Sequence, residues 1–252
     1  MITIAIANQK GGVCKTSTCL AVGAELVKRK HRVLYVDLDA QGNLTYALRG
    51  NGETGNALAA LLQPKKAGGE VQNLDGFSLL ASVPTLANAD TVLTSIGKEH
   101  KLREALAGLQ NDFDFCLIDC PPSLGILSVN ALTACKYVLV PCQADPYSLQ
   151  GLRQLGATAQ AVKNYCNPAL EILGLVIVRW NGRTVIRREL ADLLAETAAD
   201  MGATVFNTRV RENVAVIEAA ALRKPLLEYA PKSTAATDFK ALTDEILTRI
   251  GQ

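Results

Sequence analysis

The sequence predicts an α/β fold, in which a mostly parallel, twisted sheet is flanked by helices on both faces. Short apolar runs alternate with helical stretches along all 252 residues. The runs are apolar along their whole length, as expected of parallel strands that helices cover on both faces. A Gly-rich turn follows the first run directly, at the end of the strand where such sheets bind ligands.

The elements follow from runs and breaks in the apolar pattern. The predicted strands are residues 2–7, 32–36, 77–81, 115–118, 137–140, 172–178 and a short one at 204–206. The predicted helices are residues 15–28, 98–110, 149–165, 185–201 and 235–250. Segment 51–75 is rich in Gly and Ala without a clear period, so we expect a surface excursion there. Without a repeat or a linker-like tract, residues 1–252 are expected to form a single domain.

Composition favours a cytoplasmic protein. The chain is 49% hydrophobic and 20% charged, and its net charge of +2 gives no bulk attraction to nucleic acid or membranes. Seven cysteines without regular spacing do not suggest a disulfide framework or a zinc site. The N-terminus lacks a signal-peptide pattern, and no apolar run approaches the length of a membrane span.

A phosphate-binding loop follows the first predicted strand. Its backbone N–H groups would surround phosphates, Lys15 would reach the β- and γ-phosphate oxygens, and the Thr16 hydroxyl would bind Mg²⁺. The helix that follows directs the positive end of its dipole at the same anion. The residues expected to bind nucleotide here are Lys10, Gly11, Gly12, Val13, Cys14, Lys15, Thr16 and Ser17.

Carboxylates follow two further strands. Asp37 and Asp39 stand at i and i+2 after the second strand, so both can face a metal and an attacking water. Asp119 ends the strand at 115–118, where a carboxylate that supports Mg²⁺ is expected. A strand-end Asp often only caps a helix. Three such residues in this order after Lys15-Thr16 favour phosphoryl chemistry instead.

With these motifs in place, the sequence resembles the ParA/Soj family of partition ATPases. These are P-loop NTPases of the deviant Walker A class, which also contains MinD. The resemblance covers nearly the whole chain, through residues 8–17, 37–45, 119–125, 130–132, 141–152, 181–184 and 213–225.

The resemblance implies a slow ATPase that uses ATP and Mg²⁺ and forms a homodimer when ATP is bound. Lys10 corresponds to the signature lysine of the family, which reaches the phosphates of the partner subunit. Lys10, Lys15 and Asp39 are therefore the expected catalytic residues, and Asp39 would position the attacking water. Thr16, Asp37 and Asp119 are the expected support of the metal. Asn181 and Asn213 are candidates for the adenine contact.

The resemblance also implies binding to DNA without sequence preference, a stimulating partner of the ParB type, and a nucleoid-associated place in the cytoplasm. Residues 179–252 carry 11 Lys and Arg against 10 Asp and Glu, so any DNA surface needs local clustering. Ala215 stands where the family usually has Arg. The DNA-binding candidates, which could cluster into one patch, are Arg183, Arg187, Arg188, Arg209, Arg211, Arg223 and Lys224.

Cys14 departs from the phosphate-loop motif, which has Gly before the lysine. Gly adopts a positive φ without strain, whereas a residue with a Cβ is disfavoured there by roughly 1–2 kcal/mol. Beside a helix N-terminus and two lysines, the Cys14 thiol is expected to have a lowered pKa and to oppose phosphate binding. The sequence thus predicts weakened ATP binding and slow hydrolysis, unless the loop relaxes around this small side chain.

Two other functions stay open. A MinD-like ATPase would bind membranes through a C-terminal amphipathic helix, and Phe239, Leu242, Ile246, Leu247 and Ile250 have helical spacing. The polar side of that helix lacks a basic excess, and a helix docked on the core explains the same pattern, so we expect no membrane partner. A metabolic P-loop enzyme, such as an ATP-dependent ligase or an iron–sulfur reductase, would share Lys10.

Overall fold

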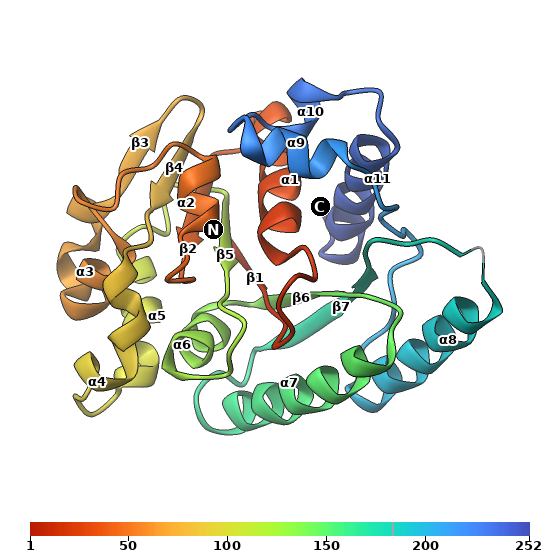
Figure 1. The fold of residues 1–252 in the computed structure, drawn as a ribbon. Helices are drawn as coiled ribbons and strands as arrows, with labels where there is room; N and C mark the ends of the chain where they lie inside the picture. Colours follow the sequence, from red (N-terminus) through yellow and green to blue (C-terminus); the bar gives the residue numbers. More distant parts are fainter. Residues whose placement is uncertain (183) are drawn as a thin grey trace.

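A seven-stranded sheet forms the centre of the computed structural model, which describes residues 1–182 and 184–252 (Figure 1). The strands are β1 (Ile2–Ile6), β2 (Val33–Asp37), β3 (Gln72–Leu74), β4 (Phe77–Leu80), β5 (Phe115–Asp119), β6 (Tyr137–Cys142) and β7 (Glu171–Ile177). They lie in the order β3-β4-β2-β5-β1-β6-β7. The edge strand β3 is antiparallel to β4, and the other pairs are parallel. The predicted fold class is confirmed.

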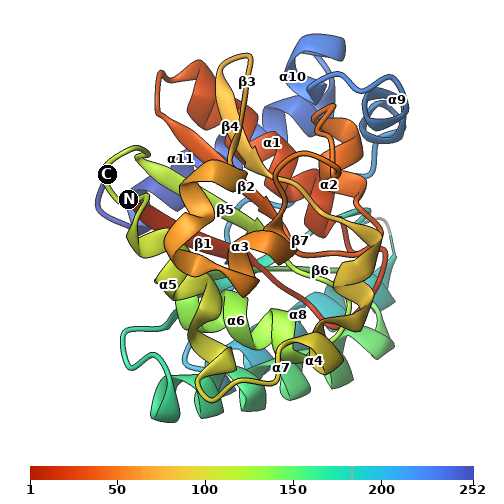
Figure 2. The same ribbon diagram turned by 90° about the vertical axis from the view of Figure 1, so that its left-hand side faces the viewer.

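Helices form two layers over this sheet (Figures 1 and 2). One face is covered by α3 (Ala57–Leu62), α5 (Lys101–Ala107), α6 (Ile126–Ala134), α7 (Pro146–Tyr165) and α8 (Val185–Asp200). The other is covered by α1 (Lys15–Lys28), α2 (Asn43–Ala47), α9 (Ala215–Ala221), α10 (Leu226–Tyr229) and α11 (Thr234–Arg249). The remaining short helices are η1 (Pro64–Glu70), η2 (Pro84–Asn88), α4 (Ala89–Val92) and η3 (Lys98–His100).

The alternation of side chains along each strand supplies both cores. In β1, Ile4 and Ile6 pack under α1 and α11, whereas Ala5 belongs to the core under α6 and α7. The two cores are therefore separated by the sheet, and every central strand is buried on both faces. This explains why the strands are apolar along their whole length.

The connections that leave β1 and β6 run in opposite directions. From β1 the chain passes through α1 to β2 on one side, and from β6 it passes through α7 to β7 on the other. Because β1 and β6 are neighbours, the loops at their carboxyl ends diverge, which is the arrangement that forms a ligand-binding crevice in open α/β sheets. In open α/β sheets ligands bind at such a switch point.

Segment 51–75, expected as a surface excursion, is instead partly built into the core. Ala57, Ala60 and Leu61 of α3 have the spacing i, i+3, i+4 and are fully buried. Asn56 caps this helix, because its side chain accepts the N–H of Ala59 at 2.9 Å. A six-residue helix is too short to show its period against a Gly- and Ala-rich background.

Residues 204–206, expected as a strand, join β7 through one isolated bridge, Val205 opposite Leu175, in the part of the chain that the structure describes. Beyond it, the Glu245 carboxylate accepts the N–H groups of Asn207 and Thr208, each at 2.9 Å. Those amides are therefore not available to a longer ladder. The segment covers the outer edge of β7 without extending the sheet.

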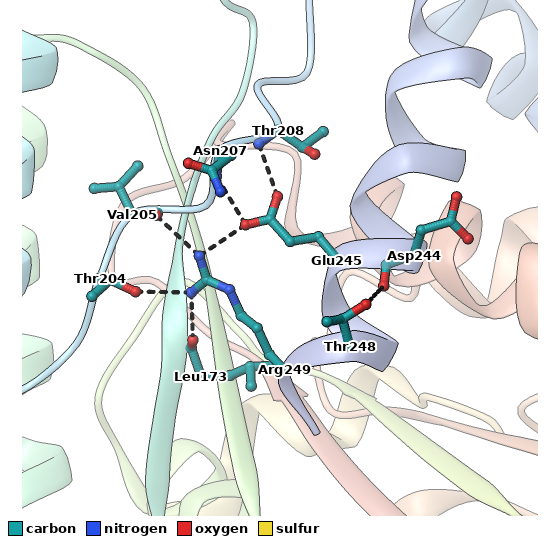
Figure 3. A network of polar contacts seen from close by, with 9 residues as sticks. All are labelled: Leu173, Thr204, Val205, Asn207, Thr208, Asp244, Glu245, Thr248 and Arg249. Carbon is teal, nitrogen blue, oxygen red and sulfur yellow. Dashed lines mark hydrogen bonds and ion pairs between the residues drawn. The ribbon is translucent and has the colours of Figure 1, made fainter. Parts of the chain in front are cut away.

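Arg249 fastens the end of α11 to that edge (Figure 3). One guanidinium nitrogen donates to the carbonyl of Leu173 and to Thr204 Oγ1, both at 3.0 Å. The other donates to the carbonyl of Val205 at 3.1 Å and to Glu245 Oε1 at 2.9 Å. The same helix turns Phe239, Leu242 and Ile246 inward, where each is almost fully buried. The C-terminal apolar stripe is therefore part of the core.

Replacing Arg249 with Ala should lower the free energy of unfolding by about 2 kcal/mol, because several charge-assisted hydrogen bonds are lost together. Urea denaturation measures this change. Lys240→Ala, at an exposed position of the same helix, should change stability by less than about 0.5 kcal/mol. Equal losses in the two variants would show that the Arg249 network does not hold α11.

Candidate functional site

The phosphate-binding loop lies on the crevice between β1 and β6 and leads directly into α1. Gly12 has φ 74° and Cys14, the residue before the helix, has φ 59°. Both therefore adopt the left-handed conformation that the motif requires, although one of them carries a Cβ. A Cβ built on Gly11 or Gly12 would meet no described atom within 4 Å, so the outer side of the loop is open.

Cys14 keeps the strained backbone, but its thiol is not activated. Burial raises the pKa of the thiol, with nearby Arg179 opposing and Glu212 adding to the rise. The expected lowering of this pKa was wrong, because the side chain is partly buried against the core of α1 rather than turned toward the lysines. A neutral thiol does not repel phosphate, which leaves backbone strain as the effect of Cys14.

Asp119 and Thr16 meet at the carboxyl end of β5. The Thr16 hydroxyl donates to Asp119 Oδ2 at 2.7 Å. The second oxygen, Oδ1, is buried and has no hydrogen-bond partner among residues 1–182 and 184–252. Burial, reinforced by the charge of Asp37, raises the pKa of Asp119 to about 8, against the opposing Thr16 hydrogen bond.

Asp37 is fully buried, and its hydrogen bonds fix the loop after β2 that contains Asp39. Its two oxygens accept the N–H of Asp39 at 3.1 Å and both the N–H and the hydroxyl of Thr45 at 2.8 and 2.7 Å. Burial raises the pKa of Asp37 to about 6. Asp39 itself is half-buried, and its carboxylate accepts the N–H of Gln41 at 3.0 Å. Ser82 closes this loop by donating its hydroxyl to the carbonyl of Asp39 at 2.5 Å.

The two lysines of the loop have different partners. Lys15 is buried, and its ammonium donates to the backbone carbonyl of Lys10 at 3.1 Å. Burial lowers the pKa of Lys15, while Asp119 opposes that change. Lys10 instead crosses the crevice and forms an ion pair with Asp145, which follows β6. The Lys15 side chain therefore lies inside the phosphate loop, whereas the Lys10 side chain extends out of it toward Asp145.

The end of β6 and the residues after it contact the start of the phosphate loop from the opposite side. Asn8 donates its amide to the carbonyl of Pro141 at 2.7 Å and accepts the N–H of Lys10 at 3.0 Å. Gln143 donates to the carbonyl of Gly12 at 3.2 Å. Sequence reasoning missed these supports, as well as Thr45, Ser82 and Asp145. The Asp145-Pro146 pair was a usable signal, because Asp at the N-cap followed by Pro at the first helical position marks a helix start.

The residues present fit a magnesium ion that is bound mainly through a nucleotide. Among the described residues, no group of three or more His, Cys, Asp or Glu side chains could hold a metal by itself. Mg²⁺ in nucleotide sites commonly takes one or two protein oxygens, with waters and phosphates as its other ligands. The Thr16 hydroxyl supplies one such oxygen, and Asp119 Oδ1, which has no hydrogen-bond partner in the described part of the chain, supplies the other.

The late loops place the two candidate adenine residues differently. The side chain of Asn213 already donates to Thr234 Oγ1 and accepts the N–H of Ala215, both at 2.9 Å. Asn181 lies exposed in the loop after β7. Between these loops, Arg179 pairs with Glu212 at 2.6 Å. The adenine contact of both asparagines stays a prediction.

The basic candidates for DNA contact have neighbours in two different groups of elements, and their clustering into one patch stays a prediction. Four of them surround Trp180 or its loop: Arg187, Arg188, Arg209 and Arg211. Arg223 and Lys224 lie apart, beside a groove along α1, where Arg223 stacks on Tyr46 at 3.7 Å. Arg183 lies outside the described residues.

Charge within the first group is partly neutralised. The Arg209 guanidinium stacks on the ring of Trp180 at 4.2 Å, a contact that does not neutralise its positive charge. Arg211 pairs with Asp238 at 2.6 Å. Arg187 and Arg188 donate to backbone carbonyls of Arg179 and Gly182 and keep their positive charge. These side chains thus supply a modest positive surface around Trp180.

Comparisons with known proteins agree on one family. Residues 1–172 match the family described as AAA domain. The chain is 40% identical over 247 residues to the chromosome-partitioning ATPase Soj of Thermus thermophilus, covering 98% of this chain and 96% of that protein. Its fold is similar to apo McdA of Cyanothece, with a TM-score of 0.88, 25% identity and complete coverage of both chains.

A further similarity links the fold to a nucleotide complex. A crystal structure of cobyrinic acid a,c-diamide synthase from Mycobacterium smegmatis with bound ADP and magnesium has a TM-score of 0.83 and 32% identity. The match covers all of this chain and 96% of that one. Sequence identity over nearly the full length, together with the phosphate loop and its carboxylates, decides the family. The chain belongs to the ParA/Soj family of partition ATPases.

Proposed function

We propose that this protein is a DNA partition ATPase whose ATP-bound form is a homodimer that sandwiches two nucleotides. The observation that carries the proposal is the position of Lys10. The inward Lys15 already serves the chain's own phosphate site, whereas Lys10 leaves the open side of the loop and lies at the crevice. A second cation there is free to stabilise phosphoryl charge on a nucleotide held by another copy of the chain.

Within one subunit, each remaining residue has a defined task. The loop N–H groups and Lys15 bind the phosphates of ATP, and Asn8 and Gln143 hold the loop in shape. Thr16 and Asp119 hold Mg²⁺, which neutralises charge on the β- and γ-phosphates when it is bound. Asp39, fixed by Ser82 and Gln41, orients the attacking water. The similar structure with bound ADP and magnesium supports an adenine nucleotide and Mg²⁺ as the molecules bound at this site.

Hydrolysis by the chain alone is proposed to be slow. A cation supplied by a second subunit is worth about 10³–10⁵ in rate in related phosphoryl-transfer systems. In the free subunit Lys10 is engaged by Asp145 and does not serve the γ-phosphate. A partner of the ParB type would raise turnover by favouring the arrangement in which the lysine is in place.

DNA contact is proposed for the ATP-bound dimer, which doubles the basic surface around Trp180. Arg187, Arg188 and Arg209 are the described side chains that carry positive charge there, with Arg183 as a sequence-based candidate. Binding through phosphates should be independent of sequence and should fall steeply with salt. Together with the partition ATPase Soj as a relative, this supports a nucleoid-associated place in the cytoplasm.

The alternatives have less support. None of the helices among the described residues is long and apolar enough to cross a membrane. The C-terminal stripe that a MinD-like membrane helix would need is buried in the core. A metabolic enzyme remains a second candidate, because one similar structure is a cobyrinic acid a,c-diamide synthase. An enzyme of that kind would need neither DNA nor an ATP-dependent dimer.

Sedimentation of the protein with ADP or with a non-hydrolysable ATP analogue tests the proposal, in the presence and absence of duplex DNA. We expect a monomer with ADP, a dimer with the analogue, and DNA binding by the dimer alone. Lys10→Ala should abolish the dimer while leaving nucleotide binding in place, and Asp39→Ala should retain the dimer with ATP. Identical sedimentation in all nucleotide states, without DNA binding at low salt, would favour the metabolic enzyme.

Cys14 provides a separate prediction about the loop. Because the free chain already has the left-handed backbone and a neutral thiol, Cys14→Gly and Cys14→Ala should both bind ATP within about two-fold of wild type. Titration calorimetry measures these affinities. A tenfold gain in both variants would mean that the thiol opposes nucleotide, as first expected. A gain in the Gly variant alone would assign the loss to the Cβ.

A further inference from the structure

We propose that Asp145 is a positioning residue that holds Lys10 within its own subunit and thereby sets how readily the ATP-bound dimer forms. This inference rests on the function proposed above, in which Lys10 acts on the partner's nucleotide. Lys10 cannot occupy both places, so its ion pair with Asp145 must break before the lysine can reach across the interface.

The two oxygens of Asp145 have separate tasks. Oδ1 accepts the N–H groups of Tyr147 and Ser148 at 3.0 and 3.1 Å and so caps α7. Oδ2 accepts the Lys10 ammonium. Helix α7 is long and carries Gly151 against Asn8 and Gln9, where an added Cβ would lie 3.6 Å from Asn8 Oδ1. The carboxylate is therefore fixed by the helix, and the flexible lysine is the partner that can leave.

Because of its location, the Lys10–Asp145 ion pair competes with the contact that Lys10 would make across the dimer interface. Lys10 follows β1 and Asp145 follows β6, so the pair bridges the crevice at the switch point of the sheet. Asp145 also lines a polar cavity of about 160 Å³, together with Gln143, Arg179 and Glu212. Both side chains are about one quarter exposed, which allows the exchange without unfolding the loop.

The expected size of the effect follows from that exposure. Ion pairs with partial exposure typically change an equilibrium by a small factor, and a symmetric dimer breaks two of them. Removing the competition should therefore tighten dimerisation with an ATP analogue by about two- to thirty-fold. Asp145→Asn is the suitable variant, because Asn caps a helix as well as Asp does and lacks the charge. Asp145→Glu should restore the pair.

The first measurement is the rate at which acetic anhydride labels the Lys10 amine in the nucleotide-free chain, read by mass spectrometry. Labelling should be several-fold faster in Asp145→Asn than in wild type, and close to wild type in Asp145→Glu. Asp200→Asn removes an exposed acid elsewhere and should not change the rate. Equal rates in Asp145→Asn and wild type would show that the ion pair does not hold Lys10, and would overturn the inference.

The second measurement is the dimer dissociation constant with a non-hydrolysable ATP analogue, obtained by sedimentation. Asp145→Asn should form the dimer at lower protein concentration than wild type, whereas Asp200→Asn should match wild type. If wild type forms the dimer and Asp145→Asn has the same dissociation constant, the role of Asp145 is overturned and the proposed function stays intact. A wild-type chain that stays monomeric with the analogue would overturn the proposed function, and the role of Asp145 with it.

Discussion

Strand β1 lies between β5 and β6, and the functional surface depends on that placement. It puts the phosphate loop beside Asp119 on one side and beside the residues after β6 on the other. The first neighbour supplies Asp119, which accepts the Thr16 hydroxyl. The second supplies Gln143, Asp145 and the Pro141 carbonyl that accepts the Asn8 amide. Without this strand order, residues more than one hundred positions apart would not meet.

The site contains two buried ionisable groups whose charged forms are disfavoured by burial. Asp119 is buried, its Oδ1 has no hydrogen-bond partner among the described residues, and its pKa is raised to about 8. Lys15 is buried and its pKa is lowered. A nucleotide with Mg²⁺ supplies the missing partners for both, because its phosphates are anions and its metal is a cation. Lys10 differs from these two groups, because its ammonium is already paired with Asp145 in the free subunit.

The sequence predicted the sheet and the core of the site, because both leave local patterns. Strands buried on both faces are uninterrupted apolar runs, and the phosphate loop and strand-end carboxylates have fixed spacing. Helix α6 was missed because most of its residues are buried and no polar face marks its period. The Cys14 pKa was wrong because burial depends on how the side chain packs, which loop spacing does not reveal. Asp145 was missed because its partner Lys10 is 135 residues away.

We infer that Asp119 and Thr16 form the protein side of a magnesium–nucleotide site. Titration calorimetry of ATP with and without Mg²⁺ tests it most directly, using wild type and Asp119→Asn. We expect Mg²⁺ to strengthen ATP binding at least tenfold in wild type and to have little effect in Asp119→Asn, which should still bind metal-free ATP. The same dependence on Mg²⁺ in both proteins, or no dependence in wild type, would contradict it.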